Sequence, residues 1–318
     1  MKKFTLYWSS LKRYEECPQA FLWYRGWGAI DLGGGPGRPK PQPFRSSRHH
    51  AVMGIVIANV IERLYNDELW RDPVGLADRL EKMVDVEWGR VTAKKKNWVD
   101  HRVAGSKYEL TKVCKDGVRG FLRTMKQHRL LGEYARAEVE LLGWIDKYNP
   151  VGGRADLIIR RQDTGTSILD GKNAKSKGRY TDPDQLRWYA MLYYLAYRQM
   201  PDRLGFNYFR YPYGTPMVDD KGNPVTNEET GQQEIEQGVD WVEFTKDDLK
   251  GLAHRAVEAR RGMDKEKFAP TPVPSICRWC DYETVCESRQ AQKASNRRRK
   301  PKKIDVLEGS NGFKDFTM

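Results

Sequence analysis

The chain has 318 residues, and its 56 lysines and arginines outnumber its 43 aspartates and glutamates, for a formal net charge of +13. No apolar run approaches the roughly 20 residues of a membrane-spanning helix, and no secretory signal pattern is found at the start. Five cysteines, an odd number, argue against a disulfide framework. We therefore expect a cytoplasmic protein whose positive charge favours a polyanionic partner, most commonly nucleic acid.

The first part of the chain is predicted to be mainly helical. Val52, Val56, Val60 and Leu64 recur at helical spacing and indicate a buried helix. The predicted elements are a short helix Ser9–Trp23 capped by Ser9 or Ser10, a Gly- and Pro-rich loop over 31–48, the buried helix from His49 to about Trp70, and helices near 75–95 and 107–130.

The pattern changes near Tyr134, where β-prone runs and turn signals begin. The predicted elements are a three-strand meander over Ala137–Trp144, Ala155–Arg160 and Thr166–Asp170, a helix from Pro183 to about Met200, strands Leu204–Tyr211 and Asp240–Phe244, and a helix Lys246–Met263 capped by Thr245. From Arg289 onward the chain is basic and poor in apolar residues, which predicts a disordered tail.

Two neighbouring strands of the meander carry acidic residues. Asp156 stands at the start of an apolar strand, and Asp170 and Lys172 follow two residues apart on the next one. Side chains two apart in a strand point to the same face, so Asp170 and Lys172 project together and strand pairing can add Asp156. Carboxylates hold Mg²⁺ or Mn²⁺, and a lysine beside the ion can orient an attacking water. Because an Asp–Lys pair on a strand is more often a solvated ion pair, its position behind a second acid-bearing strand decides the interpretation.

The helix that follows the second of these strands carries Gln185 and Tyr189, four residues apart and therefore on one face. At this position they could hydrogen-bond a phosphate or steady the lysine. An ordinary amphipathic helix is the competing interpretation.

Three cysteines near the C-terminus, Cys277, Cys280 and Cys286, form a C-x2-C-x5-C run. Cys17 is the candidate for a fourth ligand, whereas Cys114, in the middle of a helix, fits a plain core thiol. Four thiolates suit either zinc or an iron–sulfur cluster, and the spacing leaves both open. Either would fasten the N-terminal segment to the C-terminal one.

Together these stretches resemble the RecB-like nucleases of the PD-(D/E)XK group that carry an iron–sulfur cluster. That group includes CRISPR-associated RecB-like exonucleases, the AddB subunit of bacterial break-processing complexes, and related phage exonucleases. The resemblance rests on five stretches in the family's order: Ser9–Pro18, Gly153–Asp156, Asp170–Lys172, Gln185–Ala190 and Cys277–Cys286.

The resemblance implies a ligand set and a catalytic set. It implies a 4Fe-4S cluster on Cys17, Cys277, Cys280 and Cys286, with zinc as the alternative. It also implies metal at Asp156 and Asp170, Lys172 as the catalytic lysine, and Gln185 and Tyr189 as substrate-side residues.

The chain departs from the family at one position. The family places a metal-binding histidine four residues after the glycine of the first long helix, and counting from Gly54 gives Ala58. Glu62, one turn later on the same face, is the expected substitute ligand, and His49 or His50 is a less direct candidate.

The expected fold class is α/β, with a restriction-endonuclease-like mixed sheet flanked by helices, a helical N-terminal segment and a C-terminal cysteine cluster. Its expected parts are residues 1–30 with the first cluster cysteine, a mainly helical region 31–133, the nuclease core 134–265, the cysteine motif 266–288 and the basic tail 289–318.

The expected function is a Mg²⁺- or Mn²⁺-dependent DNA exonuclease acting on single strands or duplex ends in recombination, repair or phage DNA processing. The alternative is a catalytically degraded, DNA-binding accessory subunit, which the alanine at 58 would permit. No Walker A motif is present in the sequence, so any unwinding would need a helicase partner. An oligomer is possible, and the expected location is the cytoplasm of a bacterial or phage-infected cell.

Overall fold

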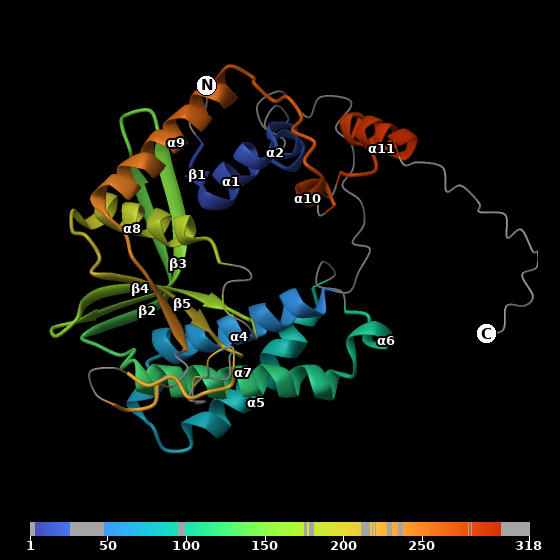
Figure 1. Cartoon of the computed structure of the whole chain (residues 1–318). Helices are drawn as coiled ribbons and strands as arrows, with labels where there is room; N and C mark the ends of the chain where they lie inside the picture. The colour runs from blue at the N-terminus through green and yellow to red at the C-terminus, as the bar shows by residue number, and fades with distance from the viewer. Residues whose placement is uncertain are drawn as a thin grey trace, which may run out of the picture.

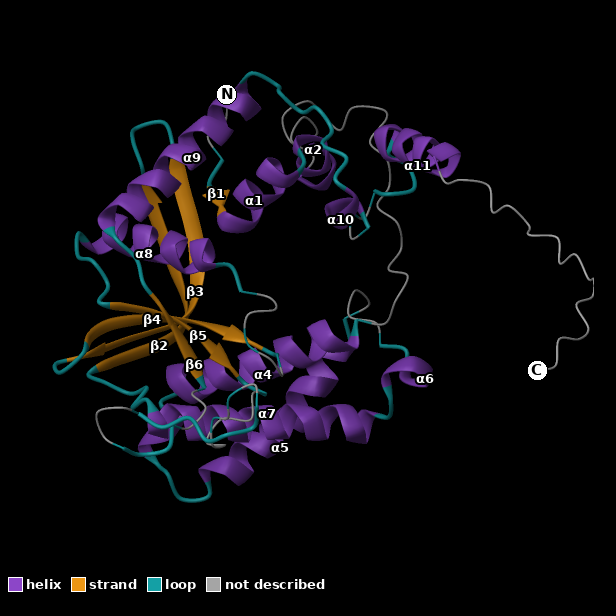
Figure 2. Ribbon diagram, in the orientation of Figure 1, coloured by secondary structure: helices purple, strands orange, loops and turns teal. Residues whose placement is uncertain are grey.

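The fold is a mixed β-sheet with helices on both faces, as the fold-class prediction requires (Figures 1 and 2). The computed structural model describes residues 4–25, 48–94, 99–174, 177, 181–210, 217, 219, 221–227, 231–234, 238–278, 280 and 282–299. Its strands are β1 Leu6–Tyr7, β2 Tyr134–Trp144, β3 Pro150–Arg161, β4 Gly165–Lys172, β5 Arg203–Tyr208 and β6 Val239–Val242.

Strand β3 organises the sheet. The strand order is β1-β3-β4-β5-β6, and β2 pairs with the other edge of β3. The β2–β3 and β3–β4 pairs are antiparallel, as a meander requires, whereas β1–β3 and β4–β5 are parallel. The predicted three-strand meander is therefore confirmed, with the two-residue strand β1 added to it from the N-terminal segment.

Two hydrophobic clusters cover the two faces of the sheet. On one face lie α4 (His49–Asn66), α5 (Leu76–Thr92) and α7 (Lys107–Gln127), and on the other α8 (Pro183–Tyr197) and α9 (Lys246–Asp264). The periodic valines of α4 and Leu64 are completely buried, which confirms the predicted buried helix. Thr245 caps α9 in a capping box with Asp248, also as predicted.

The segments at the two ends of the described chain lie side by side, on the same side of the molecule (Figure 1). They contain α1 (Trp8–Glu16), α2 (Pro18–Arg25), α10 (Pro274–Cys277) and α11 (Glu287–Arg299). The remaining short helices are the 3₁₀ turn η1 (Leu69–Arg71) and α6 (His101–Ala104).

Three predictions at the ends of the chain were wrong. The expected helix Ser9–Trp23 is two helices, because Cys17 is extended (φ −162°, ψ 102°) before Pro18, and a residue before proline avoids the helical region. Neither Ser9 nor Ser10 is the cap, since α1 already begins at Trp8. The tail expected from Arg289 is helical as far as Arg299, where α11 ends. The remainder of that tail, and most of the predicted loop 31–48, lie outside the described residues.

Candidate active site and cysteine-lined cavity

Strand register brings the two predicted acidic residues together. In the antiparallel β3–β4 pair Leu157 is opposite Leu169, which sets Asp156 opposite Asp170. Residues directly opposite in such a pair have Cβ atoms about 5 Å apart and share a face. The backbone N–H of Gly171 donates to Asp156 Oδ2 over 2.8 Å, which fixes the Asp156 carboxylate against β4.

Lys172 lies on the same strand as Asp170, with its ammonium directed back along the strand. Its Nζ is 2.5 Å from Asp170 Oδ2 and 5.3 Å from the centre of the Phe206 ring. Asp170 is only 2% exposed, so this ion pair is held in a poorly solvated place. There the Coulomb interaction is stronger than at the surface.

Gln185 connects the acid, the lysine and the tyrosine. Its Nε2 donates to Asp170 Oδ1 (2.8 Å) and to Tyr189 Oη (3.3 Å), and its Oε1 accepts from Lys172 Nζ (3.0 Å). Of the two roles considered for this face of α8, the geometry favours steadying the lysine. The five residues Asp156, Asp170, Lys172, Gln185 and Tyr189 therefore form one group in the fold.

The helix α8 is seated close to the sheet by two features. Trp188 Nε1 donates to the carbonyl of Gly152 on β3 over 3.2 Å. Gly153 leaves room for the helix, since a Cβ there would come within 3.1 Å of the Tyr189 ring and 2.8 Å of Leu192. The glycine preceding Asp156 thus allows the Gln185–Tyr189 face to reach the carboxylates.

Burial raises the pKa of both acidic residues. Burial and then the charge of Asp170 raise the pKa of Asp156, and burial raises the pKa of Asp170, although Lys172 lowers it in part. Burial also raises the pKa of Tyr189, so its hydroxyl stays protonated and able to donate. Two neighbouring carboxylates with raised pKa values are typical of functional sites.

The cavity beside the carboxylates has a volume of about 140 Å³ and lies between α4 and the sheet. Its polar lining comes from Glu138, Asp156, Asn173 and Asn207, and its other walls include Gly54, Ala58, Gly171 and several apolar side chains. Ala58 therefore lines this cavity, at the helix position where the resemblance implied a metal-binding histidine.

The sequence patterns do not single out Glu138, Asn173 or Asn207. Asn207 is 2% exposed, and its Oδ1 and that of Asn173 have no hydrogen-bond partner among the described residues. Such buried, unpaired amide oxygens are expected at sites that hold a ligand or an ion. No motif could have predicted the two asparagines, because tertiary packing alone brings β5 and the end of β4 to this cavity.

The other candidate ligands lie at the edge of this region. Glu62 on α4 is half-buried, and its charge is close enough to raise the pKa of Glu138, although burial is the larger cause. His50 approaches the cavity through its backbone, whose carbonyl accepts from Asn173 Nδ2 at 3.5 Å.

The donor set suits a hard cation. Carboxylate and amide oxygens are the ligands that Mg²⁺ and Mn²⁺ take in proteins. In the described part of the chain no three His, Cys, Asp or Glu side chains converge tightly enough to hold one ion. At the acidic site Lys172 and Gly171 N–H are bonded to the carboxylates, and like charges keep acidic side chains apart. The carboxylates therefore fit the ion by the chemistry of their oxygen donors.

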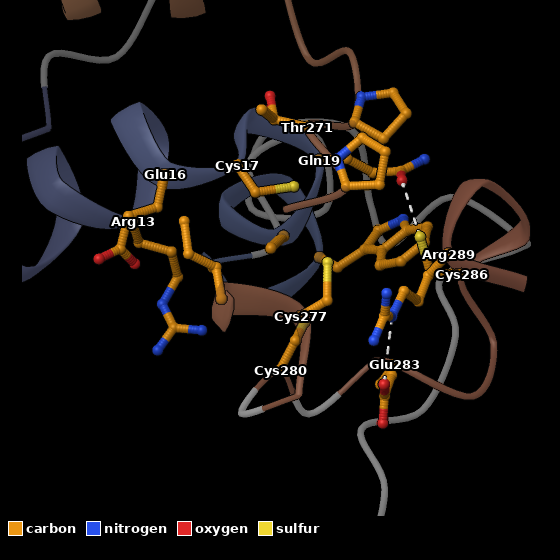
Figure 3. Close-up of a pocket in the computed structure, with 15 residues that line it drawn as sticks. Arg13, Glu16, Cys17, Gln19, Thr271, Cys277, Cys280, Glu283, Cys286 and Arg289 are labelled. Atoms are coloured by element: carbon orange, nitrogen blue, oxygen red, sulfur yellow. Dashed lines mark hydrogen bonds and ion pairs between the residues drawn. The ribbon is translucent and has the colours of Figure 1, made fainter. Parts of the chain in front are cut away.

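A second cavity, of about 180 Å³, is lined by four cysteines (Figure 3). Cys17, Cys277, Cys280 and Cys286 border it, and the close-up shows Cys17 entering from the N-terminal helices and the others from the C-terminal segment. Cys114 is elsewhere, fully buried in α7, with its Sγ 3.9 Å from the carbonyl of Met53. Fold topology thus separates the four predicted ligands from the predicted core thiol.

The surroundings of these thiols are mixed. Burial is the main cause that raises the pKa of Cys277 and of Cys280, and the neighbouring cysteines add to it. Two arginines, Arg13 and Arg289, also line the cavity. Cationic side chains beside thiols favour the thiolate, which is the form that ligates metals.

Within the described residues, no helix has the length and apolar character needed to cross a bilayer.

Comparisons with known proteins agree with this geometry. Residues 7–287 match the family model described as the PD-(D/E)XK nuclease superfamily. Curated proteins gave no significant match. Among solved structures, one titled "Crystal structure of SSO0001" aligns with 59% of this chain and 79% of its own at 14% identity, but its TM-score of 0.30 is too low to support a conclusion. Because the family model spans both the sheet and the segments that carry the cysteines, the chain belongs to the PD-(D/E)XK nuclease superfamily.

Proposed function

We propose that the chain is a metal-dependent deoxyribonuclease of the RecB-like group, an exonuclease that cuts single-stranded DNA or duplex ends. The observation that carries the proposal is the hydrogen-bonded group of Asp170, Lys172 and Gln185 beside an oxygen-lined cavity, with Asp156 bonded to the Gly171 N–H between the acid and the lysine. Within this superfamily that combination suits phosphodiester hydrolysis. A structural ion pair would not need a glutamine bonded to both of its members.

Each side chain has a separate task in this proposal. Asp156 and Asp170 would hold Mg²⁺ or Mn²⁺, which polarises a phosphate and acidifies water. Lys172 donates to the attacking water or to a phosphate oxygen, where its charge offsets the developing negative charge. Gln185 is a positioning residue, because its hydrogen bonds hold the Lys172 ammonium and the Asp170 carboxylate in their relative positions. Tyr189 would donate a hydrogen bond on the substrate side, because burial raises its pKa and keeps its hydroxyl protonated.

We further propose that Cys17, Cys277, Cys280 and Cys286 hold a 4Fe-4S cluster. The four thiols border one cavity, and the resemblance to nucleases that carry such a cluster favours iron and sulfide, with zinc as the alternative metal for four thiolates. The test is iron, sulfide and zinc analysis of anaerobically purified protein. Iron and sulfide near four per chain support the cluster, and one zinc per chain supports the alternative.

DNA is the proposed partner because the net charge of +13 favours a polyanion and because the family consists of nucleases. The proposed setting is recombination, repair or phage DNA processing in the cytoplasm. Co-purification tests for a helicase partner and for an oligomer.

The alternative function is a DNA-binding accessory subunit without catalysis. Ala58 favours it, since this methyl group faces the cavity and cannot bind a metal. The presence of Asp170, Lys172 and Gln185 in bonding contact, with Asp156 on the neighbouring strand, argues for activity.

The test is digestion of end-labelled single-stranded and double-stranded DNA with Mn²⁺, comparing wild type with Lys172→Ala. We expect wild type to cut and Lys172→Ala to lose at least about a hundredfold in rate, as removal of a single transition-state donor costs. A matched control is Lys177→Ala, a nearby lysine that pairs with Asp240 over 3.0 Å.

The outcomes separate the two functions. Cleavage by wild type and Lys177→Ala, but not by Lys172→Ala, supports the nuclease, and the product ladder gives its polarity. Binding of DNA by all three proteins without cleavage by any supports the accessory subunit.

A further inference from the structure

Glu138 has an unusual backbone conformation for its place in the sheet. It lies within β2, between pairs that are regularly registered with β3, yet its φ is +54°. A non-glycine residue in the left-handed region costs on the order of 1 kcal/mol or more, and such residues collect at functional sites. The sheet therefore holds Glu138 in a conformation that glycine would adopt more easily.

The conformation places Glu138 in the wall of the cavity beside Asp156. In the β2–β3 register Ala137 is opposite Leu157 and Val139 is opposite Ala155, so Glu138 is opposite Asp156. Both side chains line the cavity, and Ala58 lines it from α4. A carboxylate from the sheet thus enters the space that a longer side chain at position 58 would fill.

The stabilising contacts of Glu138 do not account for this arrangement. Its described hydrogen bond is with Arg154 Nη1 at 3.3 Å, and the Arg154 side chain is 66% exposed. Exposed ion pairs of this kind contribute about 0–1 kcal/mol. Half-buried near Asp156 and Asp170, the Glu138 carboxylate repels like charges, so its position costs stability in the absence of a cation.

An independent feature of the same cavity indicates a ligand. Asn207 is nine-tenths or more buried, lines the cavity, and leaves its Oδ1 without a described hydrogen-bond partner. An unpaired buried carbonyl oxygen costs about 1–3 kcal/mol unless something binds it. A hard divalent cation or its water shell satisfies both this oxygen and the carboxylates.

We propose that Glu138 is a ligand of the divalent metal ion, supplied from the sheet in place of a ligand from helix position 58. The ion is held in this cavity by Glu138 and Asp156, beside the neighbouring Asp170, with the amide oxygen of Asn207 reached directly or through a bound water. Glu62, one turn beyond Ala58, lies outside this set. This inference rests on the proposed metal-dependent function and names a residue of its site.

The experiment measures Mn²⁺ binding to the full chain, with its cysteine site intact, by isothermal titration calorimetry and Mn²⁺ paramagnetic resonance. Glu138→Gln keeps the shape and removes the charge, and Glu140→Gln removes an exposed carboxylate from the same strand as the matched control. We expect Glu138→Gln to weaken Mn²⁺ binding at least about tenfold, since even indirect ligand partners cost that much. Glu140→Gln and Glu62→Gln should bind as wild type does. Equal binding by Glu138→Gln and wild type would overturn the proposal.

Two further variants distinguish a metal-binding role of the Glu138 carboxylate from a role in stabilising the fold. Glu138→Gly relieves the positive φ, so we expect a higher melting temperature without metal together with lost Mn²⁺ binding. Ala58→His added to Glu138→Gln should restore part of the binding, because a histidine at 58 returns a ligand to the same cavity. A melting temperature that falls in Glu138→Gly would mean that Glu138 stabilises the fold, and would count against a ligand role.

Failure of this inference and failure of the nuclease proposal give different results. If wild type binds Mn²⁺ through Glu138 but cuts no DNA, the ligand assignment stands and the nuclease does not. If wild type cuts DNA in a Lys172-dependent way while Glu138→Gln binds Mn²⁺ normally, the nuclease stands and the ligand assignment falls.

Discussion

At the scale of single residues, the acidic site holds carboxylates whose negative charges repel each other. Asp156 and Asp170 face each other across two paired strands, Asp170 buried and Asp156 half-buried. Among the described residues, Lys172 supplies a positive charge by direct contact with Asp170. Such a site is expected to reduce the stability of the metal-free protein, because activity and stability make different demands on the same side chains.

Stability should consequently fall as the pH rises. The pKa of Asp156 is raised from 3.8 to about 8 by burial and by Asp170. Between these values the folded protein binds more protons than the unfolded chain, so the free energy of unfolding decreases with pH. We expect Asp156→Asn to flatten this slope and to stabilise the metal-free protein at pH 8 by on the order of 2 kcal/mol. Urea denaturation in the presence of a chelator at pH 5 and pH 8 measures both effects.

A wild-type protein whose unfolding free energy rises between pH 5 and pH 8, with no change of slope in Asp156→Asn, would contradict this prediction. The exposed Asp247, which pairs with Lys250 on α9, gives the control variant Asp247→Asn. Its substitution should leave the slope unchanged.

At the scale of elements, the site depends on close packing around β4. Gly171 separates Asp170 from Lys172, and a Cβ on it would lie 2.3 Å from Cζ of Phe209. The backbone sets the position of this Cβ, so rotating the methyl group does not relieve the close approach. The Phe209 ring is buried and has little room to move away. The glycine between the acid and the lysine is therefore required by packing, in addition to any role in the motif.

Gly171→Ala should destabilise the fold by about 1–3 kcal/mol, the usual cost of overpacking. It should also reduce cleavage, because a shifted β4 moves Asp170 and Lys172 relative to Asp156. The matched control is Gly251→Ala on α9, where a Cβ meets nothing within 4 Å. That change should raise stability by roughly 0.5–1 kcal/mol, the helical preference for alanine over glycine. Guanidinium denaturation of both variants checks the prediction, which a stable Gly171→Ala would refute.

At the scale of the whole molecule, the cysteine cavity joins segments more than 250 residues apart in sequence. Cys17 follows α1, Cys277 ends α10, and Cys280 and Cys286 lie between α10 and α11. Aromatic contacts also join these segments, including Trp23 with Tyr282 at 5.3 Å between ring centres. A bound cluster would close a long loop, and closing long loops restricts the unfolded chain most strongly.

Cys17→Ser should lose most of its iron and lower the melting temperature, because the N-terminal helices lose a covalent link to the C-terminal segment. Cys114→Ala is the control, since Cys114 lies in the core away from the cavity and should leave the iron content unchanged. Iron analysis and thermal denaturation measure the two effects. Full iron content in Cys17→Ser would exclude Cys17 as a ligand.

The sequence by itself determined the local elements and the fold class. Helical periodicity predicted α4, alternation and turn signals predicted the β2–β3–β4 meander, and the threonine cap predicted the start of α9, since each depends on neighbours in the chain. The motif spacing also selected Asp156, Asp170, Lys172, Gln185 and Tyr189, which the fold brings into contact.

Only the tertiary structure decided what else lines the site. Glu138 looks like any polar residue of an alternating strand until the β2–β3 register sets it opposite Asp156 with a positive φ. Asn207 reaches the cavity because β5 pairs parallel to β4 after a helical crossover, a long-range choice that no local pattern encodes. Likewise, Cys17 meets the other cysteines because long-range packing brings the terminal segments together. Local patterns follow from short-range sterics and burial, whereas the cavity is made by contacts between segments far apart in the chain.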